Sequence, residues 1–171
     1  NHGLIVGGDN PIEAEKVQNN IINDLKIKSR EIIPPNLEVL NKLQNNFENI
    51  NLPASHIIHT LGVDPFSFEL SHRSPHSPDQ AVFCNLKPLI IDNLNQDWGH
   101  LSKFNDYAII KDIGVIYLKK SNLLLESMLL AQASIFLKIP EGENINVLSN
   151  EECKSLINWE AEKYRKSLIQ S

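Results

Sequence analysis

The chain has 171 residues, of which 42 % are hydrophobic and 22 % are charged, and its formal net charge is −5. This composition is typical of a globular protein with one large or two small domains. The acidic balance argues against a nucleic-acid-binding protein, whose binding surface is usually basic.

Two further patterns bear on the class of protein. The most apolar stretch, residues 123–137, is too short and too interrupted by polar side chains to cross a bilayer, so we expect a buried helix and no membrane contact. Cys84 and Cys153 form no CxxC motif, which favours free thiols in a reducing compartment such as the cytoplasm.

The first 25 residues predict a strand, a glycine turn and a helix. Residues 4–6 are an apolar run that indicates a short buried strand, and two glycines end it. Asn10 is placed to cap a helix, with a proline in the first turn and Glu13 three residues after the cap. His2 stands at the entrance of the strand. The apolar face of the helix is made by Ala14, Val17, Ile21 and Leu25.

The rest of the chain predicts an α/β fold. Two prolines at 34 and 35 form a boundary, and residues 64–80, with three prolines, are predicted as a long ordered loop. Residues 93–105 are predicted as a polar surface excursion. The predicted helices cover residues 36–51, 53–62, 121–138 and 149–168, and the predicted strands cover 81–84, 88–91, 107–110 and 114–118.

The helix over 121–138 is apolar nearly all round, which predicts a central position between the sheet and other helices. The residues behind this expectation are Leu123, Leu124, Met128, Ala131 and Ile135.

A degenerate internal repeat relates the two strand–turn–helix segments. When Gly114 is placed over Gly3, Glu126 falls over Glu15 and both copies enter a helix after a polar turn. His2 then corresponds to Ile113, so chemistry that depends on this histidine is absent from the second copy.

Residues 1–8, followed by a helix that carries Ala14, resemble the C-terminal metal-ligand segment of the class II aldolase/adducin family. The resemblance implies that His2 is one ligand of a catalytic zinc ion. It also implies that a His-x-His and an acid/base glutamate precede residue 1, in a longer polypeptide. The absence of an initiator methionine and a first strand without a visible neighbour lead to the same expectation.

Three other segments resemble the longer, sugar-phosphate aldolase-like members of this family. They are residues 77–83, where Gln80 replaces the histidine of a Pro-Asp-His segment, the strand pair 107–117, and the helical residues 156–165. The resemblance therefore divides the chain in two. Residues 1–33 complete an upstream aldolase-like unit, and residues 34–171 form a second, degenerate aldolase-like α/β unit.

By resemblance, the protein is a metal-dependent aldehyde-lyase that acts on a sugar phosphate or a similar carbonyl compound and forms a homo-oligomer. The resemblance implies a divalent metal, zinc in aldolases of this family, which would stabilise the enediolate formed by retro-aldol cleavage. Two alternatives stay open: a non-catalytic, adducin-like interaction module, and a sugar-phosphate epimerase. Upstream metal ligands would favour an enzyme, and their absence would favour a module.

Other histidines suggest further candidate sites. His72, Arg73 and His76 lie close together in the proline-rich segment and are predicted to contact the anionic part of a substrate, or else to be incidental surface residues. His56 and His59 are three residues apart and could share a metal ion, although two ligands are fewer than zinc sites need. For the same reason, the chain alone is not expected to bind zinc tightly.

Overall fold

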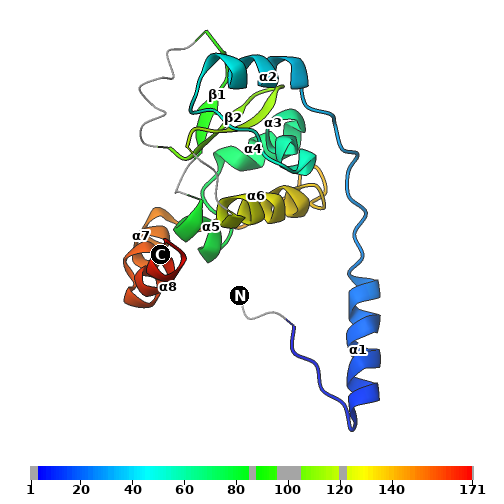
Figure 1. Ribbon diagram of the computed structural model, residues 1–171. Coiled ribbons are helices and arrows are strands. Elements are labelled where there is room, and N and C mark those ends of the chain that lie inside the picture. The colour runs from blue at the N-terminus through cyan, green and yellow to red at the C-terminus, as the bar shows by residue number, and fades with distance from the viewer. Residues whose placement is uncertain (1–3, 85–87, 96–104, 120–122, 171) are drawn as a thin grey trace.

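A three-stranded sheet lies between helices in the computed structural model, which describes residues 4–84, 88–95, 105–119 and 123–170 (Figure 1). The predicted α/β class is confirmed at this level. The strands are β1 (Leu89–Ile91), β2 (Tyr107–Ile110) and β3 (Gly114–Tyr117). The helices are α1 (Pro11–Asp24), α2 (Leu37–Asn46), the 3-10 helix η1 (His56–His59), α3 (Thr60–Val63), α4 (Pro65–His72), α5 (Pro78–Phe83), α6 (Leu123–Phe136), α7 (Asn150–Asn158) and α8 (Glu160–Gln170).

The sheet is mixed and has the order β1-β2-β3. β1 pairs with β2 in parallel, and β2 pairs with β3 as the antiparallel hairpin that the sequence predicted. The hairpin turn lacks an Asn-Gly pair, and Asp112 supplies the positive φ, at 58°. Aspartate tolerates this left-handed conformation better than most residues, so the turn forms without the usual signal.

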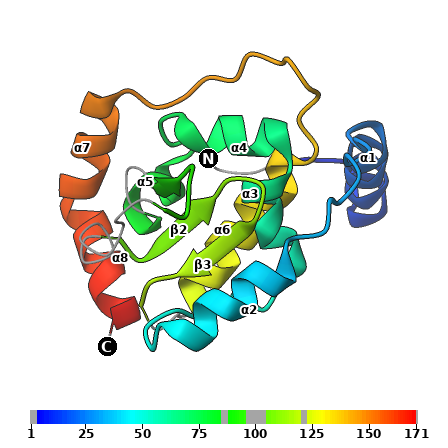
Figure 2. The same ribbon diagram turned by 90° about the horizontal axis from the view of Figure 1, so that it is seen from above.

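Both faces of the sheet are covered, which explains why its strands are apolar runs rather than alternating patterns. Figure 2 shows α2 on one side of the strands and α6 on the other. Because successive side chains of a strand point to opposite faces, Ile109 joins the core beneath α6, whereas Ala108 and Ile110 join the core beneath α2.

Helix α3 packs closely on the hairpin turn through Gly62. A Cβ atom at this position would lie 2.7 Å from the carbonyl oxygens of both Ile110 and Gly114. The amide of Asp112 also donates a hydrogen bond to the carbonyl oxygen of Gly62, at 3.0 Å. Gly62, at which the sequence predicts the end of a short helix, therefore permits the close approach of α3 to the turn.

The prediction that α6 is covered all round is wrong. Its inner face is buried against the sheet and the neighbouring helices through Leu125, Leu129, Ala133 and Phe136. Its outer face is open, because Leu123 is 88 % exposed and Ile135 is 58 % exposed. The uniform apolarity of this helix therefore does not report on its burial.

Residues 64–84 differ most from the prediction. The expected loop and the expected strand 81–84 are wrong, and the segment contains α4 and α5. Asp64 and Ser77 cap these helices, because each side chain accepts a hydrogen bond from the backbone N–H of the residue three positions later. A proline occupies the first turn of each helix. A proline at this position fits a helix, since its missing N–H would have no intrahelical partner there.

The predicted C-terminal helix is divided in two at Trp159, between α7 and α8. The capping box at its start is confirmed, because Ser149 and Glu152 each accept from the other's backbone N–H. Cys153 is buried, whereas Tyr164 and Leu168 of the predicted apolar stripe are exposed.

Residues 4–27, called the arm below, stand apart from the rest of the chain, called the body (Figures 1 and 2). Helix α1 is confirmed with Asn10 as its cap, yet it contains no buried residue. The predicted strand over 4–6 is wrong, since these residues form no strand and Ile5 is 87 % exposed. A strand needs a neighbour, and no described segment pairs with this one.

Candidate functional site

His2, the predicted metal ligand, lies outside the described residues. Within the described part of the chain, no group of three or more His, Cys, Asp or Glu side chains is arranged to hold a metal ion. No helix in those same residues combines the length and apolarity needed to cross a membrane.

The predicted substrate residues lie at the end of α4 and just after it, but they are not assembled into one site. Arg73 forms an ion pair with Glu69 of the preceding helical turn, at 2.6 Å. It also lines an open cavity of about 520 Å³, together with Pro65, Phe66, Glu69, Glu141 and Gly142. Two carboxylates beside one arginine make this cavity a poor site for a phosphate group.

His72 and His76 do not line that cavity. The Nδ1–H of His72 donates to the carbonyl oxygen of Phe68, at 2.9 Å, and the ring packs on the phenyl group of the same residue. His76 points the other way and packs edge-on against Phe136, with 5.0 Å between ring centroids. Burial lowers the pKa of His76, the charge of Arg73 lowers it further, and Gln80 partly offsets both.

His56 and His59 do not form a metal site. His59 is buried, and its Nδ1 accepts a hydrogen bond from the backbone N–H of Val115, at 3.1 Å. The two rings are 6.3 Å apart, and His56 is exposed. His59 is therefore a structural residue that joins η1 to the start of β3, and Gly114 leaves room for its ring.

The hydrogen bond and the burial of His59 determine its protonation. Burial, with a smaller contribution from the neighbouring His56, lowers the pKa of His59 from 6.5 to about 4, although the carboxylate of Glu126 opposes this shift. The neutral form is therefore the one that the folded protein stabilises.

This gives a pH prediction. Since the folded pKa lies below the unfolded one, the contribution of His59 is fully present above pH 6.5 and is lost as the pH falls towards 4. Each pKa unit of difference corresponds to about 1.4 kcal/mol. Urea unfolding at several pH values should show this decline, and His59→Gln should flatten it. His72→Gln is the control, because that ring is exposed; a slope unchanged in His59→Gln would contradict the assignment.

A polar cluster that the sequence did not predict lies beside His59. Glu126 of α6 accepts from the hydroxyl of Tyr117 and from the backbone N–H of Ser55, the latter at 3.1 Å. Burial and the hydrogen bond to Glu126 raise the pKa of Tyr117. The single charged side chain of a mainly apolar helix is the signal that could have identified this cluster. It joins α6, β3 and the chain before η1.

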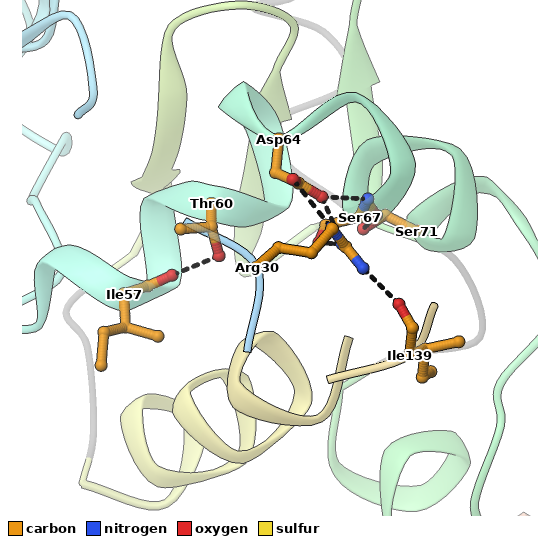
Figure 3. A network of polar contacts seen from close by, with 7 residues as sticks. All are labelled: Arg30, Ile57, Thr60, Asp64, Ser67, Ser71 and Ile139. Carbon is orange, nitrogen blue, oxygen red and sulfur yellow. Dashed lines mark hydrogen bonds and ion pairs between the residues drawn. The ribbon is translucent and has the colours of Figure 1, made fainter. Parts of the chain in front are cut away.

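A part-buried ionic network holds residue 30 against α4 and the chain after α6 (Figure 3). The guanidinium of Arg30 contacts both carboxylate oxygens of Asp64, with Nε–Oδ2 at 3.2 Å, and also donates to Ser67 Oγ, at 3.1 Å, and to the carbonyl oxygen of Ile139. It lies over the ring of Phe66, and the backbone N–H of Arg30 donates to the carbonyl oxygen of Leu137. Arg30 therefore fixes the chain between the arm and α2 onto the start of α4 and the end of α6.

Burial by itself would raise the pKa of Asp64, but the hydrogen bonds from Arg30 and Ser67 outweigh that effect and hold the pKa below its usual value. The carboxylate is thus ionised and paired in the folded state. Comparisons of the chain with protein-family models, with curated proteins and with solved structures found no match. Inference about function therefore depends on the residues and contacts described above.

Proposed function

We propose that the chain is part of a class II aldolase-like protein that cleaves or forms a C–C bond in a sugar phosphate or a similar carbonyl compound, with a divalent metal such as zinc. The observation that carries the proposal is the order of the first elements. In the sequence, residues 2–3 are the His-Gly pair and an apolar segment follows, and α1 begins at Pro11 with its Asn10 cap. This order agrees with the metal-ligand segment of that family.

In this proposal the body has an accessory role. The described residues do not fit a metal site by themselves, since His59 is engaged by Val115 and no group of three or more candidate ligands occurs among them. Of the predicted substrate residues, Arg73 lines the cavity described above, and Glu69 already pairs with it. Metal chemistry is therefore assigned to His2 together with residues outside the described part.

The proposal predicts that His2→Ala abolishes metal retention and lyase activity together in the natural protein. The thermal transition should stay nearly unchanged, because α1 contains no buried residue and the body has its own core. Metal content, cleavage of sugar phosphates into two smaller carbonyl compounds, and thermal unfolding would be measured on the same samples. His72→Ala is the matched control, since that exposed ring lies away from the cavity.

If the variant keeps its metal, the assignment of His2 is wrong. If the wild-type protein retains metal and converts a sugar phosphate into its stereoisomer without cleaving it, the epimerase alternative replaces the lyase.

A second candidate function is a non-catalytic interaction module of the adducin kind. The observation in its favour is that all three predicted substrate side chains make contacts within the chain, with Glu69, Phe68 and Phe136. A wild-type protein that never holds a metal would favour this candidate. In either case we propose a cytoplasmic location, which the free, buried Cys84 and Cys153 support.

A further inference from the structure

The turn between α4 and α5 carries a histidine whose two ring nitrogens are enclosed. Nδ1 and Nε2 of His76 are buried, and neither has a hydrogen-bond partner within the described part of the chain. The ring packs edge-on against Phe136 of α6, and the backbone N–H of His76 donates to Gln80 Oε1, at 2.7 Å. Because buried polar atoms are nearly always hydrogen-bonded, these two nitrogens require an explanation.

Residues 74–83, called the docking segment below, connect the C-terminal helices to the rest of the body. Figures 1 and 2 both show α5, which belongs to this segment, between α6 and α7. The contacts of the segment with the C-terminal region include a hydrogen bond from the Leu148 N–H to the Pro75 carbonyl oxygen, at 2.8 Å, the approach of Cys153 Sγ to Ser74 Oγ, at 4.0 Å, the ion pair of Arg165 with Asp79, and a hydrogen bond from Lys166 Nζ to the Val82 carbonyl oxygen, at 3.3 Å. A displacement of the docking segment would therefore displace α7 and α8 as well.

The C-terminal helices bury few side chains of their own. Cys153 is the one buried residue of α7, and the described side chains of α8 are exposed or half-buried. Elements with few buried apolar contacts open locally at a small cost in free energy. The docking of α7 and α8 can therefore be changed by a single group within the docking segment.

The charged groups of the elements around His76 oppose its protonation or are engaged elsewhere. Arg73, at the end of α4, carries a positive charge that disfavours a second one on His76. Among the carboxylates of these elements, Glu69 pairs with Arg73, Asp79 and Glu162 pair with Arg165, Glu126 accepts from Tyr117, Glu152 caps α7, and Glu151 and Glu160 are exposed. Within the described part of the chain, an imidazolium ring at residue 76 would therefore lack a partner.

We propose that His76 makes the docking of α7 and α8 sensitive to acid: when its ring takes up a proton, the docking segment moves away from α6 and carries both helices with it. Both nitrogens of an imidazolium ring are donors, and burying a charged donor without an acceptor is costly. Movement of the segment brings both nitrogens into contact with water. The proposal goes beyond the metal chemistry proposed above and does not depend on it.

The direction of the pH dependence follows from the surroundings of the ring. Burial lowers the pKa of His76 below 6.5 by more than Gln80 raises it, and the charge of Arg73 lowers it further. The docked state therefore binds the proton more weakly than the open state does. The equilibrium constant for opening rises as the pH falls below 6.5, by up to about tenfold per pH unit.

The test is hydrogen–deuterium exchange of the 171-residue chain in neutral and in acidic buffer, measured by mass spectrometry and corrected for the intrinsic pH dependence of exchange. We expect exchange in α7 to rise at least about fivefold in acid, between roughly pH 7.5 and pH 5. His76→Phe keeps an aromatic ring beside Phe136 but cannot be protonated, so it should abolish the rise. His76→Gln is a second variant that cannot be protonated, and circular dichroism checks that each variant folds.

Two other histidines provide the controls. His72→Gln should keep the rise in α7, because that ring is exposed. His59→Gln should keep it too, because His59 contacts the start of β3 and not the docking segment. A rise that both His76 variants retain, or that His59→Gln abolishes, overturns the proposal, as does a wild-type chain whose α7 exchanges equally at the two pH values.

A second measurement uses Cys153, which is buried while α7 is docked. The chain is treated with 4,4′-dithiodipyridine at the same two pH values, and each rate is divided by that of the urea-unfolded chain at the same pH. Peptide mass spectrometry distinguishes Cys153 from Cys84. We expect the relative rate at Cys153 to be at least about fivefold higher in acid for the wild type and unchanged for His76→Phe. A wild-type rate that does not change with pH means that α7 stays docked, which overturns the proposal.

Discussion

Arg30→Ala is expected to lower the free energy of unfolding by about 3–5 kcal/mol, the cost of leaving one partner of a buried ion pair alone. The side chain of Asp64 is 5 % exposed and caps α4, so its carboxylate cannot regain water when the guanidinium is removed. The substitution also removes the donors to Ser67 and Ile139 and frees the base of the arm.

Chemical denaturation of the wild type and the variant would check this result. Lys42→Ala is the matched control, because its ion pair with Glu38 has the same charges but is exposed on both sides, and such pairs contribute at most about 1 kcal/mol. A loss from Arg30→Ala no larger than the control would mean that Asp64 remains solvated in the folded protein.

The pH dependence of this difference follows from Asp64. Its pKa in the folded state is lower than the usual 3.8, so the pair contributes fully above that pH and less as the pH falls below it. The difference in free energy of unfolding between the wild type and Arg30→Ala should therefore become smaller as the pH falls below 3.8. His59 acts at higher pH, between 6.5 and about 4, so the two contributions can be separated.

Local signals predicted much of the fold correctly. Asn10, Asn36 and Ser149 each cap the helix that the sequence placed after them, and the hairpin of β2 and β3 has its predicted strands. These elements depend on neighbouring residues, which a single sequence contains. The signal at Asn10, a capping residue followed by proline, also stands at Asp64 and Ser77, where the sequence analysis predicted a loop because of the several prolines and serines.

Long-range partners could not be predicted in the same way. The strand expected at residues 4–6 fails because pairing requires a second strand, which no local pattern supplies. Arg30 and Asp64 are 34 positions apart, and nothing near either residue indicates the other. The predicted substrate residues are close in sequence, yet the end of α4 sends Arg73 towards the cavity and His76 towards Phe136.

Helix α6 shows the same limit most directly, and it provides the last prediction. Leu129→Ala should lower the free energy of unfolding by about 2–5 kcal/mol, because this side chain is 0 % exposed and its removal leaves a cavity in the core shared with the sheet. Ile135→Ala removes a similar amount of apolar side chain from the outer face of the same helix, where the residue is 58 % exposed.

The two variants would be compared by urea denaturation. Ile135→Ala should then cost no more than about 0.5 kcal/mol, as surface substitutions usually do. Equal losses of unfolding free energy in the two variants would mean that Ile135 is buried, as the apolar sequence of α6 predicted.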